Sequence, residues 1–249
     1  MSRYFIELAY KGTHYSGFQI QENAVTIQEQ VEKAFFIFFR EKIELTGSSR
    51  TDAGVHAYQN YFHFDREVSF DSRHIYNLNA LLPPDIVIRK VIAVQADAHA
   101  RFDALARHYQ YNIYREKNPF LNDRGWYIPY TLDVHLLNEL SRMVCGKKNF
   151  IAFSKRNTQV RSFECEVFYS YWEEEQGVLR YRVGANRFLR GMVRGLVGTM
   201  IRVSRGGLST ASFEKLLDGT EPSGADFSAP AVGLFLERVD YPPGLLNAS

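Results

Sequence analysis

The sequence has only two cysteines, Cys145 and Cys165, and it lacks any apolar run of the roughly 18 residues needed to cross a bilayer. Two cysteines make neither a disulfide framework nor a set of metal ligands, so we expect two buried thiols in a reducing compartment. The first residues also lack the apolar segment of a secretory signal. These absences predict a cytoplasmic protein that does not enter a membrane.

Motifs of several common enzyme classes are absent as well. The chain has no Gly-x-x-x-x-Gly-Lys-Ser/Thr loop, no Gly-x-Gly-x-x-Gly after a strand, no His-Glu-x-x-His, no Cys-x-x-Cys and no Gly-x-Ser-x-Gly. The seven histidines are scattered, and we interpret His56 as a residue that packs a loop. Nothing argues for ATP, NAD, zinc or a serine nucleophile, so we expect no cofactor and no metal.

The composition is that of a globular protein with an uneven distribution of positive charge. A chain of 249 residues with 45% hydrophobic residues can bury a core, and its net charge is only +2. The interval between Glu139 and Glu164, and that between Glu175 and Glu214, contain many lysines and arginines and no acidic residue. Such runs suit a nucleic-acid backbone, or they form a solvated face that acids elsewhere balance.

The apolar patterns predict two successive units with the order βαββαβ. In the first unit we expect strands over 4–10, 43–45, 60–65 and 86–94, and helices over 26–40 and 72–82. The first of these helices opens with a capping box. In the second unit we expect strands over 107–114, 163–172, 178–184 and 233–239, and helices over 133–145 and 187–203. Residues 118–130 and 218–230 read as long loops.

This order predicts an α+β fold made of two tandem ferredoxin-like halves, residues 1–100 and 101–249. We expect their antiparallel sheets to join side by side, with the helices on one face. A cleft between the two halves is then the expected ligand site.

A loop of small residues over 46–57, Thr-Gly-Ser-Ser-Arg-Thr-Asp-Ala-Gly-Val-His-Ala, follows the strand expected over 43–45 and carries one carboxylate. Glycines on either side of Asp52 allow a sharp turn and the close approach of a planar ligand. A carboxylate held there can act as a nucleophile, a base or an electrostatic stabiliser. Alternatively, Asp52 forms an Asx-turn with its own backbone, and Arg50 is a solvated neighbour.

The string from Gly47 to Ala57 resembles the signature of the tRNA pseudouridine synthases of the A type. Further segments that are similar to this family follow in order at 99–102, 106–111, 188–198, 233–236 and 239–242. The resemblance therefore extends over most of the chain. One departure is Ser49, at a position where the family more often has glycine.

The resemblance implies isomerisation of uridine to pseudouridine at positions 38–40 of the tRNA anticodon arm, by a homodimer. It implies that Asp52 is the catalytic carboxylate and that Arg194 keeps it ionised. It also implies that Tyr109 stacks on the target base and that Leu234 forms a wall of the uracil pocket. Arg50 is a candidate wedge that fills the space left by the flipped uridine.

Without the resemblance, the same residues allow plainer interpretations. Tyr109 is then a core ring on a strand, and Arg194 faces a phosphate or the solvent. The whole chain is then a non-catalytic RNA-binding protein built of two ferredoxin-like modules. A glycosidase is disfavoured because no second acid lies in a comparable loop.

Overall fold

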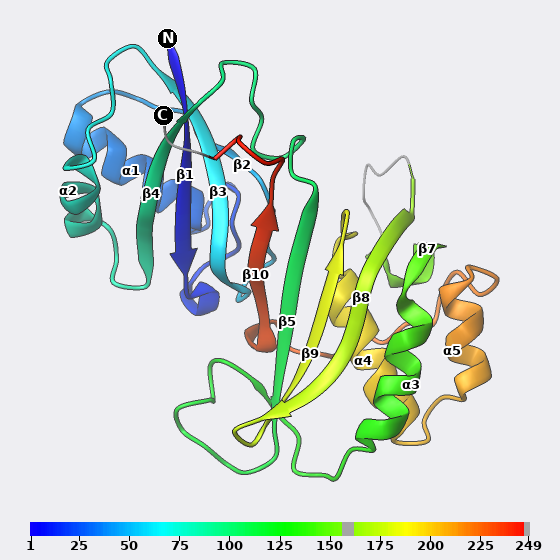
Figure 1. Ribbon diagram of the computed structural model, residues 1–249. Coiled ribbons are helices and arrows are strands. Elements are labelled where there is room, and N and C mark those ends of the chain that lie inside the picture. Colours follow the sequence, from blue (N-terminus) through cyan, green and yellow to red (C-terminus); the bar gives the residue numbers. More distant parts are fainter. Residues whose placement is uncertain (156–161, 247–249) are drawn as a thin grey trace. The chain divides into compact units, whose positions relative to one another are not determined.

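The computed structural model describes residues 1–155 and 162–246, and in it the chain divides into two compact units (Figure 1). Unit 1 comprises Met1–Leu105 and the segment from Leu236 onward, and unit 2 comprises Ala106–Phe235. The segment from Leu236 onward thus groups with unit 1, whereas the sequence analysis assigned it to the second half. The fold is mixed α/β, with five α-helices among the described residues.

Unit 1 is an antiparallel sheet with helices on one face. Its strands run in the order β4-β1-β3-β10, and the short β2 pairs with β3. On one face, Phe35 of the first helix packs edge-on against Phe64 at 5.4 Å between ring centroids. On the other, Phe5 packs against Tyr241, also at 5.4 Å. The elements are β1 (Ser2–Tyr10), α1 (Ile27–Phe39), β2 (Thr46–Gly47), β3 (His56–Arg66), α2 (His74–Leu81), β4 (Ile86–Val94) and, from Leu236 onward, β10 (Leu234–Asp240).

The N-terminus of α1 confirms the predicted capping box. The Oγ1 atom of Thr26 accepts from the backbone N–H of Glu29 at 3.3 Å, and the Glu29 carboxylate accepts from the N–H of Thr26 at 3.4 Å. Such a cap contributes about 1 kcal/mol to helix stability. The buried residues Ile27, Val31, Ala34 and Phe35 follow helical spacing, which explains why this face of α1 lies on the sheet.

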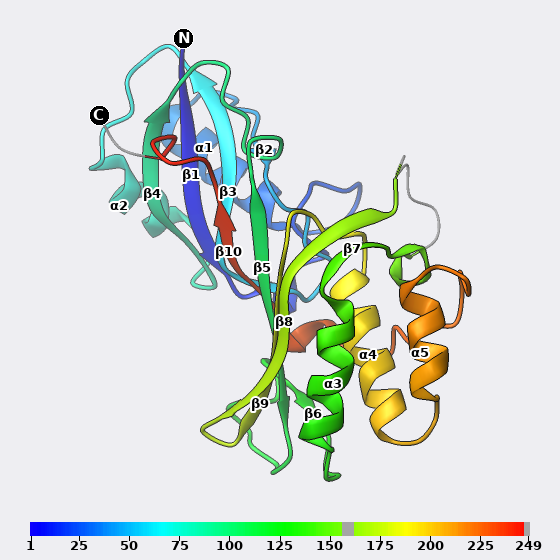
Figure 2. The same cartoon turned by 45° about the vertical axis from the view of Figure 1, so that its right-hand side comes forward.

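Unit 2 contains antiparallel strands with three helices beside them (Figure 2). Its strands run in the order β5-β9-β8-β7, and the short β6 is parallel to β5. The side chain of Asn138 in α3 accepts from the N–H of Trp172 at 2.9 Å and donates to its carbonyl at 3.0 Å. Helix α3 thus supplies hydrogen-bond partners for the backbone of Trp172 at the edge of β8. The elements are β5 (Ala106–Tyr114), β6 (Trp126–Tyr127), α3 (Val134–Val144), β7 (Gly146–Asn149), β8 (Glu164–Glu175), β9 (Val178–Ala185), α4 (Met192–Ser204) and α5 (Thr210–Leu217).

Several predicted elements differ from the structure. Residues 43–45 form no strand, and the strand at this place is Thr46–Gly47. The helix predicted over 187–203 begins only at Met192, because Gly191 adopts a left-handed conformation at φ 77° and serves as its N-cap. The helix α5 was not predicted. The strands β6 and β7 were not predicted either, because strands so short are defined by their partners rather than by their own pattern.

The two thiols differ in exposure, and no disulfide joins them. Cys165 is buried, as predicted, whereas Cys145 is partly exposed. Burial raises the pKa of both thiols, that of Cys165 to about 11, so both are protonated at neutral pH. Among residues 1–155 and 162–246, no helix has the length and apolar character needed to span a bilayer.

Candidate active site

The loop that carries Asp52 is fastened to the sheet of unit 1 through its backbone. The N–H of Ser48 donates to the carbonyl of Tyr61 at 2.8 Å, which joins the start of the loop to β3. The carbonyl of Thr51 accepts from the N–H of Phe18 at 3.1 Å. These two bonds lie on either side of Arg50, so the backbone on both sides of this residue is fixed.

Burial alternates along this loop. Ser49 and Thr51 are buried, Arg50 is exposed, and Asp52 is partly exposed. The carbonyl of Asp52 accepts from the N–H of Val55 at 3.1 Å, which closes a turn through Gly54 at φ 78°. Arg50 and Asp52 are therefore presented outward, whereas their neighbours Ser49 and Thr51 point inward.

His56 supports the end of the same loop. Its side chain is buried, and its Nδ1 atom accepts from the backbone N–H of Gly12 at 3.0 Å. A Cβ atom at Gly12 would lie only 2.0 Å from the carbonyl oxygen of Val55, so only glycine allows this approach. The interpretation of His56 as a loop-packing residue is confirmed.

His63 lies behind the loop on β3, beside a second histidine. Its Nδ1 atom accepts from the N–H of Ala100 at 3.2 Å, and its ring lies 4.6 Å from that of His99. Burial, together with the positive charge of neighbouring groups, lowers the pKa of His63 to about 4. His63 is thus a neutral hydrogen-bond acceptor at neutral pH.

In unit 2, Tyr109 lies on β5 directly opposite Val183 of β9. The ring is buried and makes an edge-on contact with Phe188 at 5.0 Å between centroids. Tyr111, two residues further along the strand, has its hydroxyl donating to the carbonyl of Pro230 at 2.8 Å. Burial raises the pKa of Tyr111, and the positive charge of Arg194 partly opposes that rise.

Arg194 lies in the first turn of α4, and its Nε atom donates to the carbonyl of Ala229 at 2.7 Å. One turn further along the helix, Gly198 lets the chain approach so closely that a Cβ atom there would lie 2.3 Å from the carbonyl oxygen of Asp226. The N–H of Asp226 donates to Thr199 at 2.9 Å. Helix α4 thus holds the segment 226–230, which leads to the buried Leu234 at the start of β10.

The glycines of α4 allow close packing on this helix. Gly195 faces the ring of Phe227, and Gly198 faces Asp226. Arg190 lies in the turn that precedes the helix.

The five predicted site residues fall into two groups. Arg50 and Asp52 belong to unit 1, and Tyr109, Arg194 and Leu234 belong to unit 2. Sequence reasoning missed the residues that brace the Asp52 loop, above all Asn60. One signal was available, since Asn60 is a polar residue inside a strand whose neighbouring residues are mostly apolar and aromatic.

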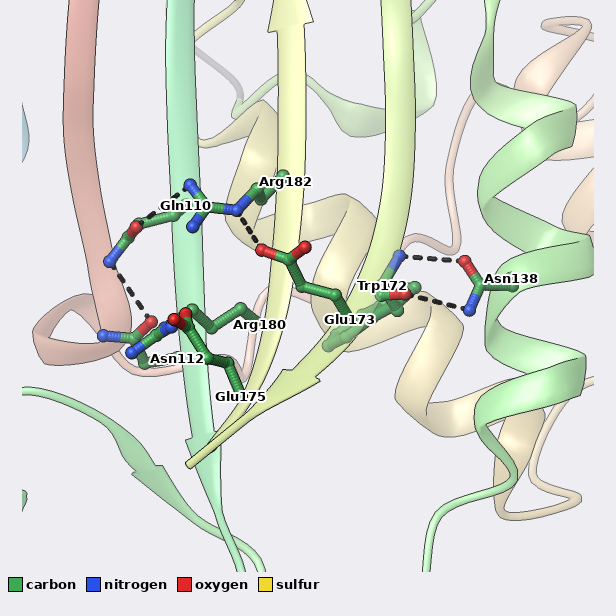
Figure 3. A network of polar contacts seen from close by, with 8 residues as sticks. All are labelled: Gln110, Asn112, Asn138, Trp172, Glu173, Glu175, Arg180 and Arg182. Carbon is green, nitrogen blue, oxygen red and sulfur yellow. Dashed lines mark hydrogen bonds and ion pairs between the residues drawn. The ribbon is translucent and has the colours of Figure 1, made fainter. Parts of the chain in front are cut away.

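The two cationic runs are partly balanced by acids. Arg180 pairs with Glu175 and Arg182 pairs with Glu173 between neighbouring strands, as Figure 3 shows, and Lys147 lies 3.6 Å from Glu164. For these cations, the interpretation of a balanced surface holds. Arg187 and Arg190 are exposed, whereas Arg156 and Arg161 lie outside the described residues.

Comparisons with known proteins show the family of this chain. The profile of a family described as "tRNA pseudouridine synthase" matches residues 8–103 and 140–242. A tRNA pseudouridine synthase A of Azobacteroides pseudotrichonymphae is 40% identical over 243 residues, which cover 97% of this chain and 98% of the relative. One of Bacteroides fragilis is 43% identical over 97% of each chain, and one of Staphylococcus aureus is 36% identical over 95% of this chain and 90% of the relative.

The matches place the Asp52 loop, Tyr109 and Arg194 within a chain that is similar to these relatives along nearly its whole length. The chain belongs to the tRNA pseudouridine synthase family, a family of isomerases.

Proposed function

We propose that this protein isomerises uridine to pseudouridine at positions 38–40 in the anticodon arm of tRNA, with Asp52 as the catalytic carboxylate. One observation carries the proposal within this family. Asp52 keeps an accessible side chain on a loop whose backbone is fixed at Ser48 and Thr51. A carboxylate held in this way loses little freedom when a substrate binds.

The reaction needs one carboxylate and neither adds nor removes electrons overall. The N1–C1′ bond of the uridine breaks, the uracil turns, and C5 bonds to C1′. The C5 hydrogen leaves as a proton and N1 takes up a proton, so the composition does not change. Asp52 attacks C1′, stabilises a cationic sugar there, or removes the C2′ proton. Each of these three routes ends in the same product.

The other site residues have complementary roles in this proposal. A flipped uridine costs a few kcal/mol of stacking, and the exposed Arg50 fills the vacated space. Tyr109, whose ring is held by Phe188, stacks on the uracil, and Leu234 forms an apolar wall. We assign Arg194 to substrate binding, as the resemblance to the family implies.

The architecture that goes with this function is a pair of ferredoxin-like halves. Support comes from the order β4-β1-β3 with β2 paired to β3 in unit 1, and from the order β5-β9-β8 in unit 2. We further propose a homodimer that acts on tRNA in the cytoplasm, as the resemblance to the family implies.

Tritium release from tRNA that carries 5-tritiated uridine tests the function directly, because forming the C5–C1′ bond expels the C5 hydrogen. We expect release by the wild type and by Asp97→Asn, a control at an exposed aspartate of unit 1, and none by Asp52→Asn.

Binding of tRNA without release by the wild type would instead support a non-catalytic RNA-binding protein. Free uracil among the products, detected by chromatography, would indicate a glycosidase. Full activity of Asp52→Asn would remove this residue from catalysis.

A further inference from the structure

A buried asparagine lies beneath the Asp52 loop. The side chain of Asn60 on β3 is 0% exposed and bonds to both backbone groups of Ser49. Its Oδ1 atom accepts from the N–H of Ser49 at 3.3 Å, and its Nδ2 atom donates to the carbonyl of Ser49 at 2.8 Å. Oδ1 also accepts from the N–H of Tyr61 at 2.8 Å, so the amide mimics the pairing of a neighbouring strand.

The second N–H of this amide continues the network toward Asp52. It donates to the hydroxyl of Tyr10 on β1 at 3.1 Å, and that hydroxyl lies 2.8 Å from Oγ1 of Thr51. Because Tyr10 accepts from Asn60, its own proton remains available for Thr51. Asn60, Tyr10 and Thr51 therefore form one buried chain of hydrogen bonds, here called the Asn60–Tyr10 relay.

The relay holds the two inward-facing residues of the loop. Ser49 and Thr51 flank Arg50, and Thr51 directly precedes Asp52. A fully bonded polar network in a buried setting is rigid, because each unpaired group would cost about 1–3 kcal/mol. The positions of Arg50 and Asp52 thus depend on partners that come from β1 and β3.

We infer that Asn60 and Tyr10 are positioning residues for the isomerisation, acting through Ser49 and Thr51 on the placement of Arg50 and Asp52. The inference rests on the proposed function. Under this inference, buried residues of unit 1 affect the rate of the reaction as well as stability. The effect can be large, because a displacement of about 1 Å at a reacting group can slow a reaction about 100-fold.

The first test removes one hydroxyl from the relay and compares it with a matched control. Tyr10→Phe deletes the hydroxyl next to Thr51. Tyr4→Phe makes the same change on the same strand, where the hydroxyl instead accepts from the N–H of Phe70 at 3.2 Å. We expect Tyr10→Phe to lower kcat for tritium release about 10- to 100-fold with KM within about twofold, and Tyr4→Phe to leave both unchanged.

A double-mutant cycle with Thr51→Val tests whether the two residues act together. If loss of the Tyr10–Thr51 hydrogen bond causes the fall in kcat, adding Thr51→Val to Tyr10→Phe lowers kcat little further, because the same bond is already lost. Losses in kcat that multiply independently would overturn the coupling. Equal kcat for Tyr10→Phe and wild type would overturn the inference, and so would equal losses in Tyr10→Phe and Tyr4→Phe.

Hydrogen exchange separates failure of the inference from failure of the proposed function. We expect faster exchange at the amides of residues 48–55 in Tyr10→Phe than in Tyr4→Phe. A wild type that releases no tritium refutes the proposed function and, with it, the catalytic role of the relay. An active wild type with unchanged exchange and kcat in Tyr10→Phe refutes the relay alone.

Discussion

The Nε atom of Arg194 donates to the carbonyl oxygen of Ala229 at 2.7 Å. This bond joins the first turn of α4 to a segment 35 positions further along the chain. It holds the planar guanidinium in one orientation, while the terminal nitrogens keep further donors. If activity depends on both the charge and the orientation of this guanidinium, replacing Arg194 by lysine lowers the activity, because lysine keeps only the charge.

We predict that Arg194→Lys lowers kcat for tritium release about tenfold and that Arg194→Ala lowers it further. Lysine keeps the charge but has no Nε–H in this fork. Arg202→Lys is the matched control, because the Nε atom of Arg202 donates to the carbonyl of Gly207 at 3.1 Å on the exposed end of the same helix. Full activity of Arg194→Ala would remove Arg194 from the site.

Ser49→Ala is expected to be neutral or stabilising. Within the described part of the chain, the buried Oγ atom of Ser49 has no hydrogen-bond partner, so its removal relieves a desolvation cost. We expect urea unfolding to show an unchanged free energy, or a gain of up to about 1 kcal/mol, with kcat retained.

The control for Ser49→Ala is Ser170→Ala, whose Oγ atom lies 2.7 Å from the Tyr181 hydroxyl inside unit 2. Its loss should cost about 1–2 kcal/mol. An equal cost in the two variants would show that the Ser49 hydroxyl is satisfied in solution.

His63 should make stability fall as the pH decreases from about 6.5 to about 4. Its pKa in the folded protein is about 4, below the ordinary value of 6.5, so the unfolded chain binds more protons in this window. The contribution is fully present above pH 6.5 and is lost as the pH falls. His99, whose pKa burial also lowers, adds to this effect, whereas Asp65 and Asp103 oppose the lowering at His63.

Thermal unfolding of wild type and His63→Gln between pH 4 and 7 measures this contribution. Glutamine can still accept from the N–H of Ala100 but does not titrate. We expect a shallower decline of Tm with acid in the variant. Parallel curves would assign the acid sensitivity to other groups.

The exposed Arg187 and Arg190 should carry more of the tRNA affinity than the half-buried Arg180 and Arg182. Neutralising the exposed Arg187 and Arg190 with glutamine should reduce the slope of log affinity against log salt by roughly 1.5, the share of two phosphate contacts. Neutralising Arg180 and Arg182, which pair with Glu175 and Glu173, should leave the slope unchanged. The reverse result would place the tRNA path on the sheet face shown in Figure 3.

Long and regular elements could be predicted from local pattern. The strand Ile86–Val94 has the predicted bounds, and the helix after Thr26 has the predicted cap. The start of α4 was wrong because one left-handed residue, Gly191, decides it. The charge runs were ambiguous because cations on β9 meet acids on β8, and such cross-strand partners follow from register rather than from nearby sequence.

Local sequence is enough to define the family, the loop that carries Arg50 and Asp52, and the alternation that forms the strands, because these depend on residues close together in the chain. The contacts that hold that loop follow from the tertiary structure. Asn60 and Tyr10 are 50 positions apart, and Tyr10 and Thr51 are 41 apart. Their hydrogen bonds exist because folding places β1, β3 and the loop side by side, and a buried polar group must find its partner wherever the fold brings one.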